Sequence, residues 1–64
     1  MKVKYSAEVD ALIIRFSDAK IDESGEGKPG VIPDYDTDGN IVRMEILKAS
    51  QRIGNPQNIE FEVA

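Results

Sequence analysis

Residues 34–45, DYDTDGNIVRME, constrain this chain more than any others, because they match two incompatible structures. The spacing D-x-D-x-D-G-x5-E is that of a calcium-binding EF-hand loop, with a glycine at the sharp turn and a glutamate at the last ligand position. The same Asp-Thr-Asp-Gly sequence is typical of a type I turn whose glycine makes the bulge of a short β-hairpin. The residues on either side decide between the two.

The flanking residues favour the hairpin. The preceding segment, 27–33, reads GKPGVIP, and two prolines and two glycines within seven residues exclude the helix that enters an EF-hand loop. The residues after the turn alternate as a strand does. In a hairpin, Glu45 is expected roughly 20 Å from the turn and on the opposite sheet face from Asp34. Weak calcium or magnesium binding at Asp34, Asp36 and Asp38 is the alternative prediction.

Alternating apolar residues predict the strands. They lie at Lys2–Tyr5, Ala11–Ser17, Val31–Asp36, Ile41–Leu47 and Asn58–Ala64. Leu47–Ile53 favours a helix of about two turns, which Gly54 and Pro56 end. Residues 18–30, rich in glycine and charge, predict a flexible internal loop. The expected fold class is α+β: a small antiparallel sheet, made of a meander of about four strands plus a C-terminal strand, with one short helix, in the order β-β-β-β-α-β.

The turn also sets an expected register. If Asp36 pairs with Asn40, Tyr35 lies opposite Ile41 and Asp34 lies opposite Val42. The apolar, inward face would then carry Ile32, Val42, Met44 and Ile46, with Asp34 at its margin. Pro33 lacks an N–H group, which places its strand at a sheet edge or requires a bulge there.

Length and composition limit how such a sheet can be stabilised. The 64 residues make a single small domain, 1–64, which buries about 60% of its unfolded surface. Without cysteine or histidine, disulfides, thiol catalysis and the commonest zinc ligands are excluded. We therefore expect a homodimer, formed by edge pairing or strand exchange through Phe61 and Val63.

Charge and hydropathy narrow the partners. The net charge is −4, from 12 acidic and 8 scattered basic residues. Nucleic-acid binding needs clustered lysine and arginine and is disfavoured. The longest apolar run, Ala11–Ile14, is too short to span a bilayer, and no signal peptide is recognised. We expect a cytoplasmic protein that contacts neither nucleic acid nor membrane.

No catalytic residue and no cofactor are predicted. The serines have no histidine to activate them. Arg15 and Arg43 are interpreted as pairing across strands with a glutamate, Glu45 or Glu62, rather than as forming an anion site. The expected function is a non-enzymatic protein-interaction module.

Two blocks of the sequence resemble a known family. YSAEVDALII is similar to the Tyr-x-x-x-x-Asp-Ala-Leu start of domain of unknown function family 2283, and PGVIPDYDTDGNIVRMEIL resembles its second block. The resemblance covers residues 2–50 and departs from the family pattern at Pro33 and Arg43. It is carried by Tyr5, Asp10, Ala11, Leu12, Asp36, Asp38, Gly39 and Glu45.

The resemblance implies little about chemistry. The family consists of short prokaryotic proteins without an established activity, some of them encoded beside small toxin-like genes. An antitoxin-like role, in which the chain binds a small protein partner, is what this implies. It supplies no catalytic residues.

Overall fold

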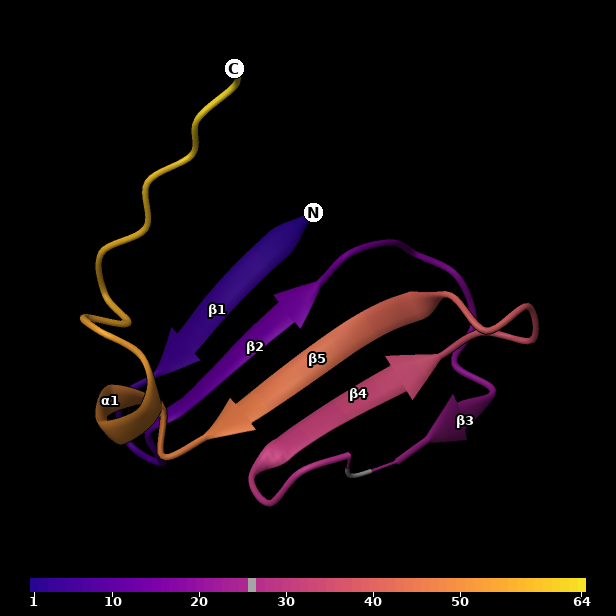
Figure 1. The fold of residues 1–64 in the computed structure, drawn as a ribbon, viewed down its shortest axis with the longest axis horizontal. Coiled ribbons are helices and arrows are strands. Elements are labelled where there is room, and N and C mark those ends of the chain that lie inside the picture. The colour runs from indigo at the N-terminus through magenta and orange to yellow at the C-terminus, as the bar shows by residue number, and fades with distance from the viewer. Residues whose placement is uncertain (26) are drawn as a thin grey trace.

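The computed structural model describes residues 1–25 and 27–64. In them the chain forms one antiparallel sheet of five strands in the order β1-β2-β5-β4-β3, followed by one short helix (Figure 1). The elements are β1 (Lys2–Ser6), β2 (Ala11–Arg15), β3 (Glu23–Ser24), β4 (Val31–Tyr35), β5 (Ile41–Leu47) and α1 (Ala49–Arg52). The predicted small antiparallel sheet with one short helix is confirmed, and the molecule is mostly β.

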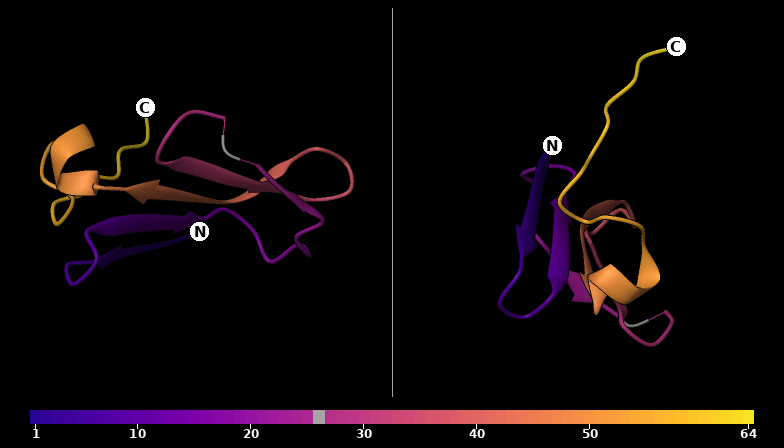
Figure 2. Two further views of the ribbon diagram at one scale, coloured as in Figure 1. Left: turned by 90° about the horizontal axis from the view of Figure 1, so that it is seen from below. Right: turned by 90° about the vertical axis from the view of Figure 1, so that its left-hand side faces the viewer.

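The longest strand, β5, joins two hairpins into one sheet. The β1–β2 hairpin pairs from Lys2 with Arg15 to Ser6 with Ala11, and β2 then pairs with β5. On the other side, β5 pairs with β4. Figure 2 shows that the sheet is not flat and that the two hairpins are offset from each other, as is usual for a small twisted sheet.

The predicted hairpin turn is present, but the register beyond it is shifted. The Asp36 N–H group donates to the Asn40 carbonyl at 3.0 Å, and Gly39 has φ of +85°. Tyr35 lies opposite Ile41 as expected. A β-bulge between Asp34 and Tyr35 then moves the pairing by one residue, so that Asp34 lies opposite Arg43 and not Val42.

This shift corrects the expected faces of the hairpin. Because side chains alternate along a strand, a shift of one residue on β4 exchanges its two faces relative to β5. Ile32 lies opposite Glu45, and Asp34 lies opposite Arg43. The prediction that Asp34 borders the apolar face was wrong, as was the prediction that Glu45 lies on the opposite face from Asp34.

Pro33 occupies an inner strand without losing a hydrogen bond to β5. Its carbonyl accepts the Gly25 N–H group at 3.2 Å on the β3 side. The nitrogen and carbonyl of one strand residue point the same way, so the missing N–H also faces the β3 side. The short strand β3 ends at Ser24, so none of its residues needs that donor, and the bulge lies one residue further on, between Asp34 and Tyr35.

The predicted loop 18–30 contains a short strand. β3 pairs Glu23 with Tyr35 and Ser24 with Asp34, so it forms the outer edge of the sheet beside β4. Lys28 and Val31 form an isolated bridge before β4 begins. Residue 26 lies outside the described residues, and the flexibility of the loop stays a prediction.

The C-terminal part corrects the predicted element order. The helix is shorter than expected, with Ile53 as its C-cap. Residues 58–64, all within the described part of the chain, form no strand. They extend beyond the sheet in Figure 1. The observed order is therefore β-β-β-β-β-α, because the extra strand comes from the loop and the terminal one does not form.

The core is small and lies along β2 and β5. Its buried hydrophobic residues are Ala11, Leu12, Val42 and Ala49, of which Val42 and Ala49 have no exposed surface. The helix contributes Ala49, and the Ala49 N–H group donates to the Asp10 carbonyl at 2.9 Å. No helix in the described residues is long and apolar enough to cross a membrane.

Candidate functional site

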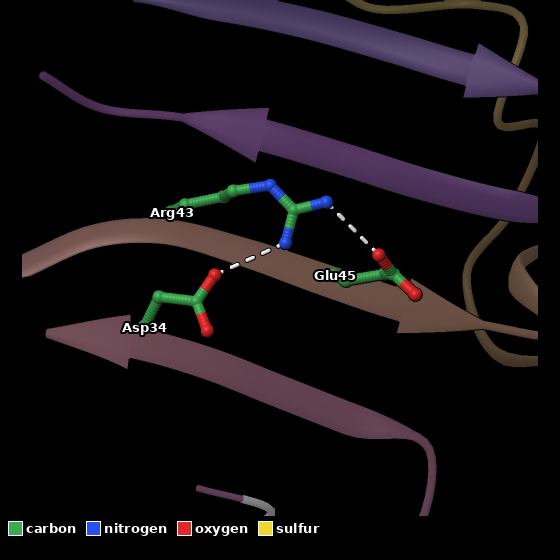
Figure 3. A network of polar contacts seen from close by, with 3 residues as sticks. All are labelled: Asp34, Arg43 and Glu45. Atoms are coloured by element: carbon green, nitrogen blue, oxygen red, sulfur yellow. Dashed lines mark hydrogen bonds and ion pairs between the residues drawn. The ribbon is translucent and has the colours of Figure 1, made fainter. Parts of the chain in front are cut away.

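An ion-paired cluster occupies the polar face of the sheet. Arg43 on β5 reaches Asp34 on β4 at 3.0 Å and Glu45 on its own strand at 3.0 Å (Figure 3). The side chain of Asp34 is only 7% exposed, whereas Arg43 and Glu45 are each 26% exposed. Arg43 thus pairs with a glutamate, as predicted, but along its own strand, and its partner across strands is Asp34. The cluster bridges two strands and fixes the shifted register.

The contacts within this cluster favour the charged forms of Asp34 and Arg43. A hydrogen bond from the Ser24 side chain lowers the pKa of Asp34, and Arg43 adds to that effect against the opposing cost of burial. The hydrogen bond to Glu45, followed by that to Asp34, raises the pKa of Arg43. A carboxylate that is held ionised by two donors is a structural anchor and not a poised proton acceptor.

The same face carries a row of cations. Arg43 lies opposite Arg15 on β2, and Arg15 lies opposite Lys2 on β1. Neighbouring like charges on a sheet are unfavourable unless an acid compensates them. Among the described residues, Lys2, Lys4 and Arg15 take part in no ion pair. An open hollow of about 400 Å³ at this end is lined by Met1, Lys2, Arg15, Ser17 and Asp18.

The aspartates of the turn have separate partners. The Asp36 carboxylate accepts the N–H groups of Asp38 and Asn40, each at 2.9 Å, and the Asn40 amide at 3.3 Å. The Asn40 backbone bond contributes most to the lowered pKa of Asp36. Asp34 points instead to Arg43. No group of three or more acidic, histidine or cysteine side chains suited to a metal ion occurs in the described residues.

Asp10 fastens the helix to the first hairpin. Its carboxylate accepts the Tyr5 hydroxyl at 2.6 Å, the Ser50 N–H group at 3.0 Å and the Ser50 hydroxyl at 2.7 Å. The bond from Tyr5 is the main cause of the lowered pKa of Asp10, and the same bond raises the pKa of Tyr5. Asp10 thereby satisfies the N-terminus of α1, although it lies 40 residues earlier in the chain.

The C-terminal segment is the most exposed apolar part of the chain. Ile59, Phe61 and Val63 are 58%, 80% and 80% exposed. They alternate with Glu60 and Glu62, which is the pattern of a strand with one apolar face. In the structure this segment contributes no strand to the sheet.

The strands of the sheet fall within a region that matches a known family. The model of DUF2283, proteins of unknown function, matches residues 2–50. The chain belongs to DUF2283. No curated protein and no solved structure matches the chain. The DUF2283 match runs from the start of β1 to Ser50, and the C-terminal segment lies outside it.

Most of the residues that mark the chain as a DUF2283 member have structural roles. Tyr5 and Asp10 form the contact with Ser50, and Ala11 and Leu12 belong to the core. Asp36 caps the turn, and Gly39 adopts its positive φ. The DUF2283 pattern thus describes how this sheet is built.

Two contacts were missed from the sequence. The Asp34–Arg43 pair depends on the bulge, which Pro33 hinted at without fixing its position. The Asp10–Ser50 contact joins residues 40 positions apart in the sequence, and a strand pattern contains no signal for it. The positive φ of Asp10, 54°, was accessible only as a general preference of aspartate for that conformation.

Proposed function

We propose that the chain is a non-enzymatic protein-interaction module that binds its partner through the C-terminal segment 58–64. The exposure of Phe61 and Val63, each 80%, carries this proposal. Apolar side chains that alternate along an extended segment are the form in which peptides add to the edge of another sheet. Large apolar side chains gathered on one exposed segment are a feature of interaction sites.

The non-enzymatic part of the proposal rests on the state of the acidic groups. Asp10, Asp34 and Asp36 accept hydrogen bonds within the fold, and each has a lowered pKa. A general acid or base at neutral pH needs the opposite shift, toward the working pH. The acidic surface, with a net charge of −4, favours a protein partner over a nucleic acid.

The partner class follows from the family resemblance. A small protein encoded beside this chain, bound and neutralised in the cytoplasm, is the antitoxin-like form of the proposal. Binding by strand addition would cover the segment's apolar face and supply its unpaired backbone groups with partners.

Co-expression with the product of the adjacent gene tests the proposal. We expect a complex that co-purifies with the full chain and is weakened by replacing Phe61 and Val63 with serine. The matched control is Val9→Ser, because Val9 is also apolar and 67% exposed but lies in the β1–β2 connection. Equal binding by all variants would contradict the role of the segment. Absence of both a complex and neutralisation would count against an antitoxin-like role.

A further inference from the structure

The outer edge of β1 is a free strand edge with a marked pattern. β1 stands at the end of the sheet and pairs only with β2 among the described strands. Val3 and Tyr5 lie on the face that carries Ile14, whereas Lys2 and Lys4 lie on the opposite face. Lysines on an edge strand discourage pairing with any strand that lacks matching charges. This edge therefore favours a partner strand whose acidic residues match its lysines.

The C-terminal segment has the complementary pattern. We propose that residues 59–63 of one copy pair antiparallel with β1 of a second copy, in a reciprocal exchange that forms a homodimer. The inference rests on the proposed function, because it uses the same C-terminal segment, with a second copy of the chain as the occupant. The register places together Tyr5 with Ile59, Lys4 with Glu60, Val3 with Phe61, and Lys2 with Glu62.

This register is favoured over its neighbours. A shift by one residue would put Glu60 and Glu62 opposite the apolar residues of β1. A shift by two residues keeps the faces matched but leaves one lysine–glutamate pair where the proposed register has two. Opposite charges and apolar pairs directly across two strands each stabilise the pairing, so this register satisfies both.

The added strand also completes two rows that cross the sheet. Phe61 would extend the apolar row in which Val3, Ile14 and Met44 lie opposite one another. Glu62 would extend the cationic row of Lys2, Arg15 and Arg43, which has an acid, Asp34, at its other end only. The acid that this row lacks beside Lys2 is thus supplied by the second copy.

The beginning of the segment is held against the domain, and the remainder projects away from it. Pro56 is buried, and the turn beside it is held by the Asn58 N–H group donating to the Asn55 carbonyl at 3.1 Å. Figure 1 and the right-hand view of Figure 2 show the chain leaving this turn and projecting past its own sheet. A small core with many exposed apolar residues commonly gains its stability from oligomerisation.

A charge exchange tests the pairing in the full-length chain. One variant carries Lys2→Glu and Lys4→Glu, and the other carries Glu60→Lys and Glu62→Lys. Each variant alone places like charges across the interface, so its dimer should dissociate at least about tenfold more readily than the parent dimer. Mixing the two restores opposite charges at both interfaces, and sedimentation should show heterodimers of near-parental affinity.

The matched control is Glu8→Lys with Glu23→Lys, which changes the net charge by the same amount at exposed sites on other elements. It should dimerise more tightly than the Glu60→Lys, Glu62→Lys variant. If both variants dimerise as tightly as the parent, the inference is overturned, because the dimer would then use another surface. Circular dichroism checks that every variant keeps the sheet.

Engineered cysteines fix the direction and the occupant, because the chain has none of its own. Lys4→Cys mixed with Glu60→Cys should give a covalent dimer under mild oxidation. Lys4→Cys mixed with Glu62→Cys reports the parallel arrangement and the antiparallel register shifted by two residues, and a higher yield there overturns the proposed pairing. A disulfide that forms only within the double variant Lys4→Cys, Glu60→Cys would show that the segment docks on its own sheet, which overturns the exchange.

These outcomes separate the inference from the proposed function. A parent chain that stays monomeric at high micromolar concentration but binds the product of the adjacent gene refutes the homodimer and leaves the interaction module intact. A chain that binds neither itself nor that product contradicts both.

Discussion

Two regions of this chain have the same alternating pattern of apolar residues, but one lies within the sheet and the other is exposed. On β5, Val42 is completely buried, whereas Phe61 and Val63 in the C-terminal segment are 80% exposed. β5 has a partner strand on each side, and the C-terminal segment has none among the described strands. Alternation thus identifies a chain that can form a strand, but the strand forms only where a matching edge is within reach.

The largest expected difference between the two regions is in core stability. Replacing Val42 with alanine should lower the free energy of unfolding by about 2–3 kcal/mol, because it removes buried methyl groups and leaves a cavity. The same replacement at Val63 should change it by less than about 0.5 kcal/mol. Urea unfolding at a concentration that keeps the chain monomeric measures both. A large effect at Val63 under those conditions would show that the segment is packed on its own domain.

A smaller effect is expected at the ion-paired cluster. Asp34→Asn keeps the shape of the side chain but removes the charge that Arg43 and Ser24 contact, and it should lower the free energy of unfolding by about 1–2 kcal/mol. Asp38→Asn, in the exposed turn, is the matched control and should leave the urea midpoint unchanged. Equal effects at the two positions would mean that the bulged register does not depend on Asp34.

The next effect in size is expected at the contact between the β1–β2 hairpin and α1. Asp10→Asn retains a side chain that tolerates positive φ while weakening the acceptor for Tyr5 and Ser50. We expect the Ser50 amide to exchange with solvent about fivefold faster, with little change in the amides of β5. Tyr5→Phe should show a weaker form of the same effect. Unchanged exchange in both variants would remove Asp10 as the anchor of α1.

Acid should lower the stability of the fold in part through the carboxylate of Asp34. The pKa of Asp34 is lowered by folding, so between the lowered value and about pH 3.9 the unfolded chain binds more protons than the folded chain. The stability that Asp34 contributes is therefore present at neutral pH and is lost as the pH falls below about 4. The Asp34→Asn variant should lose less stability than the parent over that range. Parallel loss in both would place the acid sensitivity at other carboxylates.

The sequence predicted local structure better than it predicted which residues pair across strands. The hairpin turn at residues 36–39 and the helix within residues 47–53 depend on neighbouring residues, and both a turn and a shorter helix form there. The predicted register of β4 was wrong by one residue, because a bulge between Asp34 and Tyr35 changes which strand faces meet. Neither strand pattern contains information about that choice.

The candidate sites divide in the same way. A glutamate partner for Arg43 was predicted from the general tendency of strand arginines to pair with acids, although the pair with Glu45 lies along one strand and not across two. Asp34 joins them only through the bulge, and Asp10 reaches Ser50 only through the tertiary fold. The C-terminal strand was predicted from an alternation that is real, but within this chain the segment pairs with none of the described strands.

The smallest effect is expected at the turn whose sequence matches an EF-hand loop. The hairpin turns Asp36 toward the N–H groups of Asp38 and Asn40, and Asp34 toward Arg43, so the aspartates do not converge on one point. An ion that recruited them would have to displace both the turn hydrogen bonds and the ion pair. We therefore expect the Gly39 amide resonance to stay fixed as calcium is raised to about 5 mM, beyond the range of the weakest extracellular calcium modules. A saturable shift at Gly39 that is lost in Asp36→Asn would show instead that the turn binds the ion, and that the sheet accommodates it without the helices that an EF-hand requires.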